Sequence, residues 1–257
     1  MFSFSSSALV DQPFDWAYQL EDLGYSGWEI VNEGRQRLTA ETLPLAQEIV
    51  ETTDLVITIH LPYSDLNLAS MNQPIWEETL RQMKECISLA SEFCGLAVVH
   101  PGYLSPLGKQ MPDRAWEQNI LGLQEICDHA EEFGMRIAVE NMLNIESMLG
   151  RTPEEILGML ENVRRENLGF VFDVGHANTN GNVDSFLALK EKMIHVHVHD
   201  NKGARDEHLP VKSGNVNWRR VAKGLEGYEG RFVTEARTLV QGAQSMRNLK
   251  GFLEGSA

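Results

Sequence analysis

Cysteines and long apolar runs are both scarce in this 257-residue sequence. Its three cysteines, Cys86, Cys94 and Cys127, lack CxxC spacing and fall in segments with helical periodicity, so we expect buried, reduced thiols. No uninterrupted apolar stretch is long enough to span a membrane. The opening MFSFSSSALV has no basic residues before its short apolar run, which is unlike a signal peptide. These absences predict a cytoplasmic protein that does not enter the membrane.

Positive charge is also in short supply. The chain has 22 Lys and Arg against 37 Asp and Glu, a formal net charge of −15. Neutralising many phosphates requires clustered cations, so this balance argues against a broad nucleic-acid surface. Lys202, Arg205 and Lys212 nevertheless lie in one segment and could bind one or two phosphates of a substrate. A solvated basic loop is an equally good interpretation of that segment.

The sequence contains no Pro/Gly/Ser linker, low-complexity tract or charge run that would divide it, so we expect residues 1–257 to form a single domain. Short runs rich in Val and Ile alternate with longer amphipathic segments, as in sheets covered on both faces. The strands predicted from these runs are Phe2–Ser5, Gly27–Val31, Leu55–His60, Leu96–His100, Arg136–Glu140, Leu168–Asp173, Ile194–His199 and Arg231–Glu235.

Helical patterns separate the predicted strands. WEETLRQMKECISLASEFCG places Leu80, Met83 and Ile87 on one face and ends at a glycine. TPEEILGMLENV has Thr152 as N-cap and Pro153 in its first turn, and NVDSFLALKEK and VNWRRVAKGLEG follow later. Eight strand–helix units close most simply into an α/β fold of the (β/α)8 TIM-barrel type. A doubly wound open sheet is the alternative, but no GxGxxG loop follows the first strand.

Side chains that can bind metals gather where the predicted strands end. Catalytic groups of such barrels lie at the C-terminal ends of the strands, because those ends carry the loops of the active face. The residues at or just after these ends are His60, His100, Glu140, Asp173, His176, His197 and Glu235. Any one of them alone would more often be structural, but six strands converging on one rim predict a metal site. Imidazoles and carboxylates without thiolates favour zinc, manganese or iron.

The segment MIHVHVHDNKGARDEH holds four of the eight histidines. Residues two apart share one face of a strand, so His195, His197 and His199 should point into the barrel. Val196 and Val198 should then pack outward against helices. The three histidines would lie at different depths, so only one or two could reach a metal at the rim. The deepest, His195, is expected to be a hydrogen-bonded core residue.

These motifs carry a family resemblance. IHLPYSDLNLAS, VVHPG, AVENM…MLGRTPEE, FDVGHAN, HVHVHDNK…DEH and VTEA resemble the xylose isomerase-like TIM-barrel superfamily, from GYSGWEI to VTEAR. That superfamily contains endonuclease IV (AP endonuclease family 2) and sugar isomerases and epimerases. The endonuclease IV resemblance implies up to three zinc ions and a set of nine ligands. The matching positions are His60, His100, Glu140, Asp173, His176, His197, Asp206, His208 and Glu235.

The epimerase branch implies a smaller ligand set around one zinc or manganese ion. Its four members here would be Glu140, Asp173, His197 and Glu235. We prefer His197 to His199 as the ligand, because the family resemblance implies a His-x-x-Asp pattern in the seventh strand, which HVHD satisfies with Asp200. The choice between the two histidines stays open.

Two enzymatic functions follow. In a sugar or sugar phosphate isomerase or epimerase, Glu140 and Glu235 would be the catalytic pair that removes and returns a proton. His176 would orient a substrate hydroxyl, and Trp28 or Tyr63 would form a wall of the pocket. The opening SFSSSAL…FDWAYQLEDLGYSGWEI resembles the epimerase branch more than the endonucleases. The excess of acidic residues also favours this function over DNA cleavage.

The alternative is hydrolysis of phosphodiesters at abasic DNA sites. Clustered metals would lower the pKa of bound water to about 7, and Tyr63 matches a position that contacts DNA in endonuclease IV. A third hypothesis is a barrel that binds a metal without catalysis, because a fold does not fix a function. Barrels of this group often pair, so a homodimer is a further expectation that no sequence feature proves.

Overall fold

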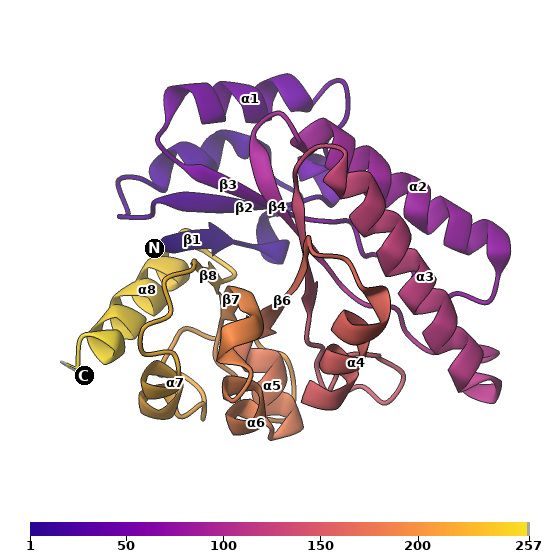
Figure 1. Ribbon diagram of the computed structural model, residues 1–257. Coiled ribbons are helices and arrows are strands. Elements are labelled where there is room, and N and C mark those ends of the chain that lie inside the picture. The colour runs from indigo at the N-terminus through magenta and orange to yellow at the C-terminus, as the bar shows by residue number, and fades with distance from the viewer. Residues whose placement is uncertain (256–257) are drawn as a thin grey trace.

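The computed structural model describes residues 1–255. Eight parallel strands pair in chain order and close on themselves, since β1 pairs with both β2 and β8. The prediction of a (β/α)8 barrel is therefore confirmed (Figure 1). The strands are β1 (Phe2–Ser5), β2 (Gly27–Val31), β3 (Val56–His60), β4 (Cys94–Val99), β5 (Arg136–Glu140), β6 (Leu168–Asp173), β7 (Met193–Val198) and β8 (Phe232–Glu235).

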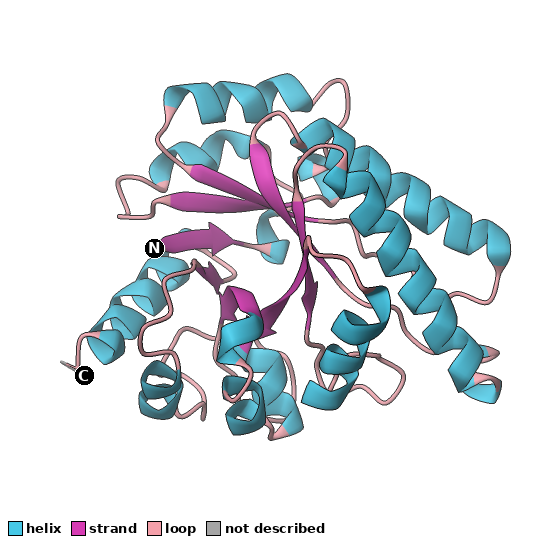
Figure 2. Ribbon diagram, in the orientation of Figure 1, coloured by secondary structure: helices cyan, strands magenta, loops and turns pink. Residues whose placement is uncertain are grey.

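Helices surround the barrel on its outside (Figure 2). The α-helices are α1 (Leu43–Thr52), α2 (Gln73–Ala90), α3 (Pro112–Glu131), α4 (Pro153–Val163), α5 (Val174–Asn180), α6 (Val183–Leu187), α7 (Trp218–Gly224) and α8 (Leu239–Leu253). Shorter 3-10 helices cover Ser7–Leu9, Phe14–Gln19, Gly34–Gln36, Gly108–Gln110 and Lys190–Lys192. The connection between β1 and β2 thus contains 3-10 helices, whereas the pattern of eight strand–helix units predicts an α-helix there. Among residues 1–255, every helix is too short or too polar to cross a bilayer.

Local sequence signals set most element boundaries. The Thr152 hydroxyl accepts a hydrogen bond from the Glu155 backbone N–H at 3.3 Å and begins α4 as predicted, with Pro153 in the first turn. The segment expected to form one helix up to Gly95 is instead divided. Helix α2 ends at Ala90 and Cys94 begins β4, because the chain must turn there to enter the barrel. All three cysteines are buried free thiols.

Alternation along the strands separates an outer apolar layer from the barrel interior. Val196 and Val198 of β7 belong to the outer core, as predicted. Trp28 of β2 is fully buried in that layer, with its ring 5.5 Å from those of both Phe14 and Trp16. This corrects the expectation that Trp28 walls the pocket, because its neighbour Glu29 occupies the inward position of the strand.

Candidate active site

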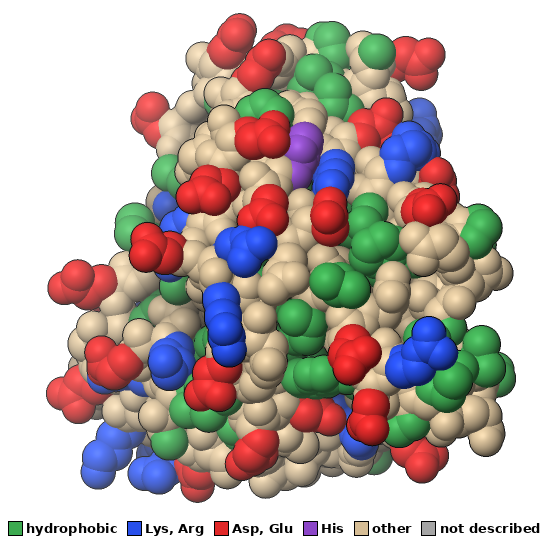
Figure 3. Space-filling view, turned by 45° about the vertical axis from the view of Figure 1, so that its right-hand side comes forward, with side chains coloured by type: hydrophobic (Ala, Val, Ile, Leu, Met, Phe, Trp, Pro, Cys, Tyr) green, Lys and Arg blue, Asp and Glu red, His purple; other side chains and the backbone are tan. Residues whose placement is uncertain are grey.

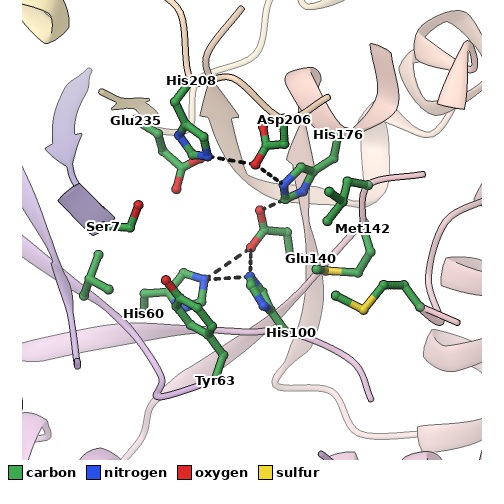
Figure 4. Close-up of a pocket in the computed structure, with 13 residues that line it drawn as sticks. Ser7, His60, Tyr63, His100, Glu140, Met142, His176, Asp206, His208 and Glu235 are labelled. Atoms are coloured by element: carbon green, nitrogen blue, oxygen red, sulfur yellow. Dashed lines mark hydrogen bonds and ion pairs between the residues drawn. The ribbon is translucent and has the colours of Figure 1, made fainter. Parts of the chain in front are cut away.

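A cavity of about 290 Å³ opens at the C-terminal ends of the strands (Figure 4). Seven of the nine predicted ligand positions line it, and the other two, Asp173 and His197, lie fully buried beneath. The seven are His60, His100, Glu140, His176, Asp206, His208 and Glu235. The rim of the barrel therefore brings together residues from six strands and the loops that follow them.

Four of these residues form the deepest group. Glu140, Asp173, His197 and Glu235 each offer one ligand atom, and these four atoms lie within 4.8 Å of one another. His197 Nδ1 is 3.1 Å from Glu140 Oε1, 3.5 Å from Glu235 Oε1 and 3.9 Å from Asp173 Oδ2. The residues come from β5, β6, β7 and β8, four consecutive strands of the sheet, so the curvature of the barrel brings their ends together.

The electrostatics of this group fit a divalent cation. Burial raises the pKa of Glu235 above its usual value, and the charges of Asp173 and Glu140 add to the shift. Burial alone would also raise the pKa of Glu140, but His197, His100 and His60 hold it well below its ordinary value. Among residues 1–255, no Lys or Arg lines the cavity. Two buried carboxylates and the partly exposed Glu235 beside them are unfavourable without a fixed cation. The mixed oxygen and nitrogen donors suit zinc or manganese.

A second group lies on the β3 and β4 side of the pocket. His60 Nε2 is 3.1 Å from His100 Nε2 and 3.3 Å from Glu140 Oε2, and His100 Nε2 is 3.2 Å from the same carboxylate oxygen. The Nδ1 atom of His60 lies 2.9 Å from the Leu61 carbonyl oxygen. If that nitrogen donates to the carbonyl, neutral His60 presents the lone pair of Nε2 to its neighbours, as a metal ligand must.

A third group lies on the β6 and β7 side. Asp206 Oδ2 is 2.9 Å from His208 Nε2 and 3.5 Å from His176 Nε2, and Figure 4 shows this row along the pocket wall. The His199 ring stacks on that of His208 at 4.1 Å, and its Nε2 lies 3.1 Å from Asp173. Sequence reasoning placed His199 on the inward face but preferred His197. The structure places both histidines beside Asp173, with His197 Nδ1 3.9 Å and His199 Nε2 3.1 Å from its carboxylate.

The loop between β7 and α7 holds Asp206 and His208 in place. Its anchor is Asp200, whose carboxylate accepts hydrogen bonds from Trp218 Nε1 at 2.9 Å and from the Val216 backbone N–H at 3.2 Å. The aspartate of the His-x-x-Asp pattern is therefore fully buried under the loop and does not line the pocket.

Tyr63 follows β3 and faces the pocket, as predicted for a wall residue. Its ring lies 4.7 Å from that of His100. Glu33 Oε1 accepts hydrogen bonds from the backbone N–H groups of Tyr63 and Ser64, at 2.7 and 2.8 Å, which fixes this turn. Burial raises the pKa of the Tyr63 hydroxyl, and Glu33 and Glu235 add to the shift. The hydroxyl therefore stays protonated and can donate to a substrate oxygen.

Sequence reasoning missed the apolar side of the pocket. Met142, Leu143 and Met148 line it from the connection between β5 and α4. No motif signalled them, because methionine and leucine in a loop carry no periodicity. Lys202 and Arg205, in contrast, are exposed and do not line the cavity. Their placement agrees with the solvated-loop interpretation.

This arrangement defines a (β/α)8 barrel with a rim pocket of imidazoles and carboxylates. The chain belongs to the xylose isomerase-like TIM barrel family, which matches residues 17–253. It is 36% identical over 261 residues to an uncharacterized protein of Methanocaldococcus jannaschii, covering 98% of this chain and 89% of that protein. A crystal structure of a D-tagatose 3-epimerase-like protein superposes with a TM-score of 0.93 at 35% identity, over 99% of this chain and 97% of the other.

Named enzymes are more distant. Fructoselysine 3-epimerase of Shigella flexneri is 25% identical over 244 residues, covering 88% of this chain and 86% of the enzyme. A probable endonuclease 4 of Acholeplasma laidlawii is also 25% identical, but over 184 residues that cover 65% of this chain and 61% of the relative. The epimerase similarity thus extends over more of the chain, and it supports an enzyme of the sugar epimerase or isomerase type.

Proposed function

We propose that this protein is a divalent-metal-dependent epimerase or isomerase of free sugars, whose proton transfers are made by Glu140 and Glu235. The observation that carries the proposal is the placement of these two carboxylates. They belong to β5 and β8, approach the same nitrogen of His197, and both line the cavity. Because β6 and β7 lie between β5 and β8 in the sheet, a substrate carbon in the cavity would have one glutamate on each side.

Epimerisation needs this two-sided arrangement. A carboxylate on one face takes the proton from the carbon next to the carbonyl, and a carboxylic acid on the opposite face returns a proton with inverted stereochemistry. The two glutamates exchange roles in the reverse direction. Glu140, Asp173, His197 and Glu235 would hold the divalent ion, which when bound polarises the carbonyl and acidifies the neighbouring C–H. His176 and the Tyr63 hydroxyl would orient substrate oxygens.

The walls of the pocket support an uncharged sugar over a sugar phosphate. Phosphate recognition usually relies on Arg, Lys or a helix N-terminus. In the part of the chain that the structure describes, no Lys or Arg lines this cavity. Met142, Leu143 and Met148 form an apolar side instead. They would contact the carbon skeleton of the sugar away from the carbonyl.

The test is a panel of free ketoses incubated with the Mn²⁺-loaded protein in deuterated water. We expect epimerisation with deuterium at the inverted carbon, and loss of epimerisation in Glu140→Gln and Glu235→Gln. Glu146→Gln is the matched control, because Glu146 is exposed in the same β5–α4 connection as the pocket methionines. The proposal fails if the metal-loaded protein exchanges no carbon-bound proton in any ketose.

One observation favours a second candidate, metal-dependent hydrolysis at abasic DNA sites. Nine candidate ligands are more than a single ion binds. Besides the group of four, they include His60, His100, His176, Asp206 and His208. However, the described residues place no Lys or Arg in the cavity lining, and acidic and basic side chains are interspersed on the outer face seen in Figure 3. Cleavage of an abasic-site oligonucleotide by protein with about three bound zinc ions would favour this candidate, whereas one bound ion with ketose turnover supports the epimerase.

A further inference from the structure

A buried carboxylate beneath the pocket has no part in the proton transfers described above. Glu29, at the centre of β2, is fully buried and points into the barrel. Its Oε2 accepts a hydrogen bond from the Thr58 hydroxyl at 2.9 Å and lies 2.8 Å from His195 Nε2. Its Oε1 lies 3.0 Å from His197 Nε2. Glu29 thus connects β2 to β7, two strands that are not neighbours in the sheet.

His197 consequently has a carboxylate at each ring nitrogen. Nε2 faces Glu29 below, and Nδ1 faces Glu140 and Glu235 above. Neither His197 Nε2 nor Glu29 Oε1 forms a hydrogen bond within residues 1–255, so their 3.0 Å approach is an ion-pair contact, and the ring is hydrogen-bonded at Nδ1, to Glu140 Oε1 at 3.1 Å. A neutral imidazole carries a single N–H. If that N–H is at Nε2 and points to Glu29, the lone pair of Nδ1 is directed into the group of four candidate ligands.

The alternative that Glu29, His195 and His197 hold an ion of their own fits the structure less well. Their ligand atoms lie close enough for it. However, Oε2 of Glu29 already has two hydrogen-bond partners, Thr58 and His195. In addition, none of the three side chains lines the described cavity, through which an ion could enter. The hydrogen bonds at Oε2 and the enclosed setting therefore favour direct contact between these side chains over coordination of an ion.

We propose that Glu29 is a positioning residue that fixes the ring orientation and the Nε2–H tautomer of His197, so that Nδ1 is the metal-binding atom. Metal-bound histidines generally donate their other ring N–H to such a partner, and the partner increases the basicity of the ligand. The inference rests on the proposed function only in requiring that the four-residue group binds a divalent ion.

The first experiment compares Glu29→Gln with a matched variant, Thr58→Val, by calorimetric titration of each metal-free protein with Mn²⁺. Glutamine keeps the size of the side chain but removes its charge, and its NH₂ group can turn toward Nε2 and force the proton to Nδ1. We expect Glu29→Gln to bind Mn²⁺ about 10- to 100-fold more weakly. Thr58→Val removes one hydrogen bond from Oε2 and leaves Oε1 against His197, so it should retain the parental affinity. Equal affinities of the parent and Glu29→Gln, or equal losses in both variants, would overturn the inference.

A second measurement does not depend on whether the Glu29 variant folds. Two-bond ¹H–¹⁵N spectra of the parent protein with ¹⁵N-labelled histidine, recorded with Zn²⁺, report which nitrogen of each ring is protonated. The His197 signals are assigned by their loss in His197→Gln. We expect a protonated Nε2 and a zinc-shifted Nδ1, and the reverse pattern contradicts the inference while leaving a metal-dependent function intact. A parent protein that binds neither Mn²⁺ nor Zn²⁺ overturns both proposals.

Discussion

Glu140 and Glu235 lie on two different strands, yet each places a carboxylate oxygen within 3.5 Å of His197 Nδ1. This relationship depends on the curvature of the barrel, because β6 and β7 lie between β5 and β8 in the sheet. The two carboxylates therefore enter the pocket from different sides. A site built in this way can exchange a proton on both faces of one carbon, and the following predictions test that capacity.

Removal of divalent metal should destabilise the protein. Without a cation, the buried Asp173 and Glu140 carboxylates and the partly exposed Glu235 lose their compensating charge. Ligand binding at 100 times its Kd adds about 2.7 kcal/mol to the free energy of unfolding, so EDTA should lower the Tm and Mn²⁺ should restore it. Thermal melts with and without the chelator check this. An unchanged Tm in EDTA would argue against a resident ion.

Substitution of one glutamate should leave one-sided proton exchange. In Glu235→Gln, Glu140 can still remove and return a proton on its own face, so one epimer should exchange its proton with solvent without inversion. Epimerisation itself should fall by about 100-fold or more. NMR of each separate epimer in deuterated water measures both rates. Metal content must be measured in parallel, because each glutamate is also a candidate ligand. Exchange from both epimers in the variant contradicts the two-sided mechanism.

The Tyr63 hydroxyl should act as a neutral donor over a wide pH range. Its pKa is raised, so the phenol remains protonated as the pH rises through the ordinary value for tyrosine, and alkaline pH should not remove its hydrogen bond. Tyr63→Phe should lower kcat/KM by up to about tenfold, as expected for one neutral hydrogen bond. Both proteins should show the same alkaline limb in their pH–rate profiles. A limb that is present in the parent and absent in Tyr63→Phe would contradict the raised pKa.

The N-cap of α4 should contribute measurably to stability. Thr152→Ala removes the acceptor for the Glu155 backbone N–H and should lower the free energy of unfolding by about 1 kcal/mol. Urea unfolding measures the change. Thr52→Ala is the control, because Thr52 is exposed in the last turn of α1, where its hydroxyl donates to the Glu48 carbonyl. Equal changes in the two variants would show that capping is not the cause.

The sequence alone determined most of the elements and the residue types that gather at the site. Periodicity is local, so the strands Gly27–Val31, Arg136–Glu140 and Leu168–Asp173 have the bounds predicted from their apolar runs. The rule that barrel chemistry lies at strand ends then selected residues that do meet at one rim. Both steps need only spacings of two or a few residues along the chain, which the sequence displays directly.

Tertiary structure decided which side chains meet and at what depth. Alternation places Trp28 and Glu29 on opposite faces of β2 but does not say which face is inward, and only the closed barrel assigns the tryptophan to the outer layer. Glu29 and His197 lie far apart in the sequence, and their contact depends on the register of every strand between them. The position of His199 beside Asp173 has the same origin. Non-local distances of this kind follow from closure of the sheet, which no short stretch of sequence encodes.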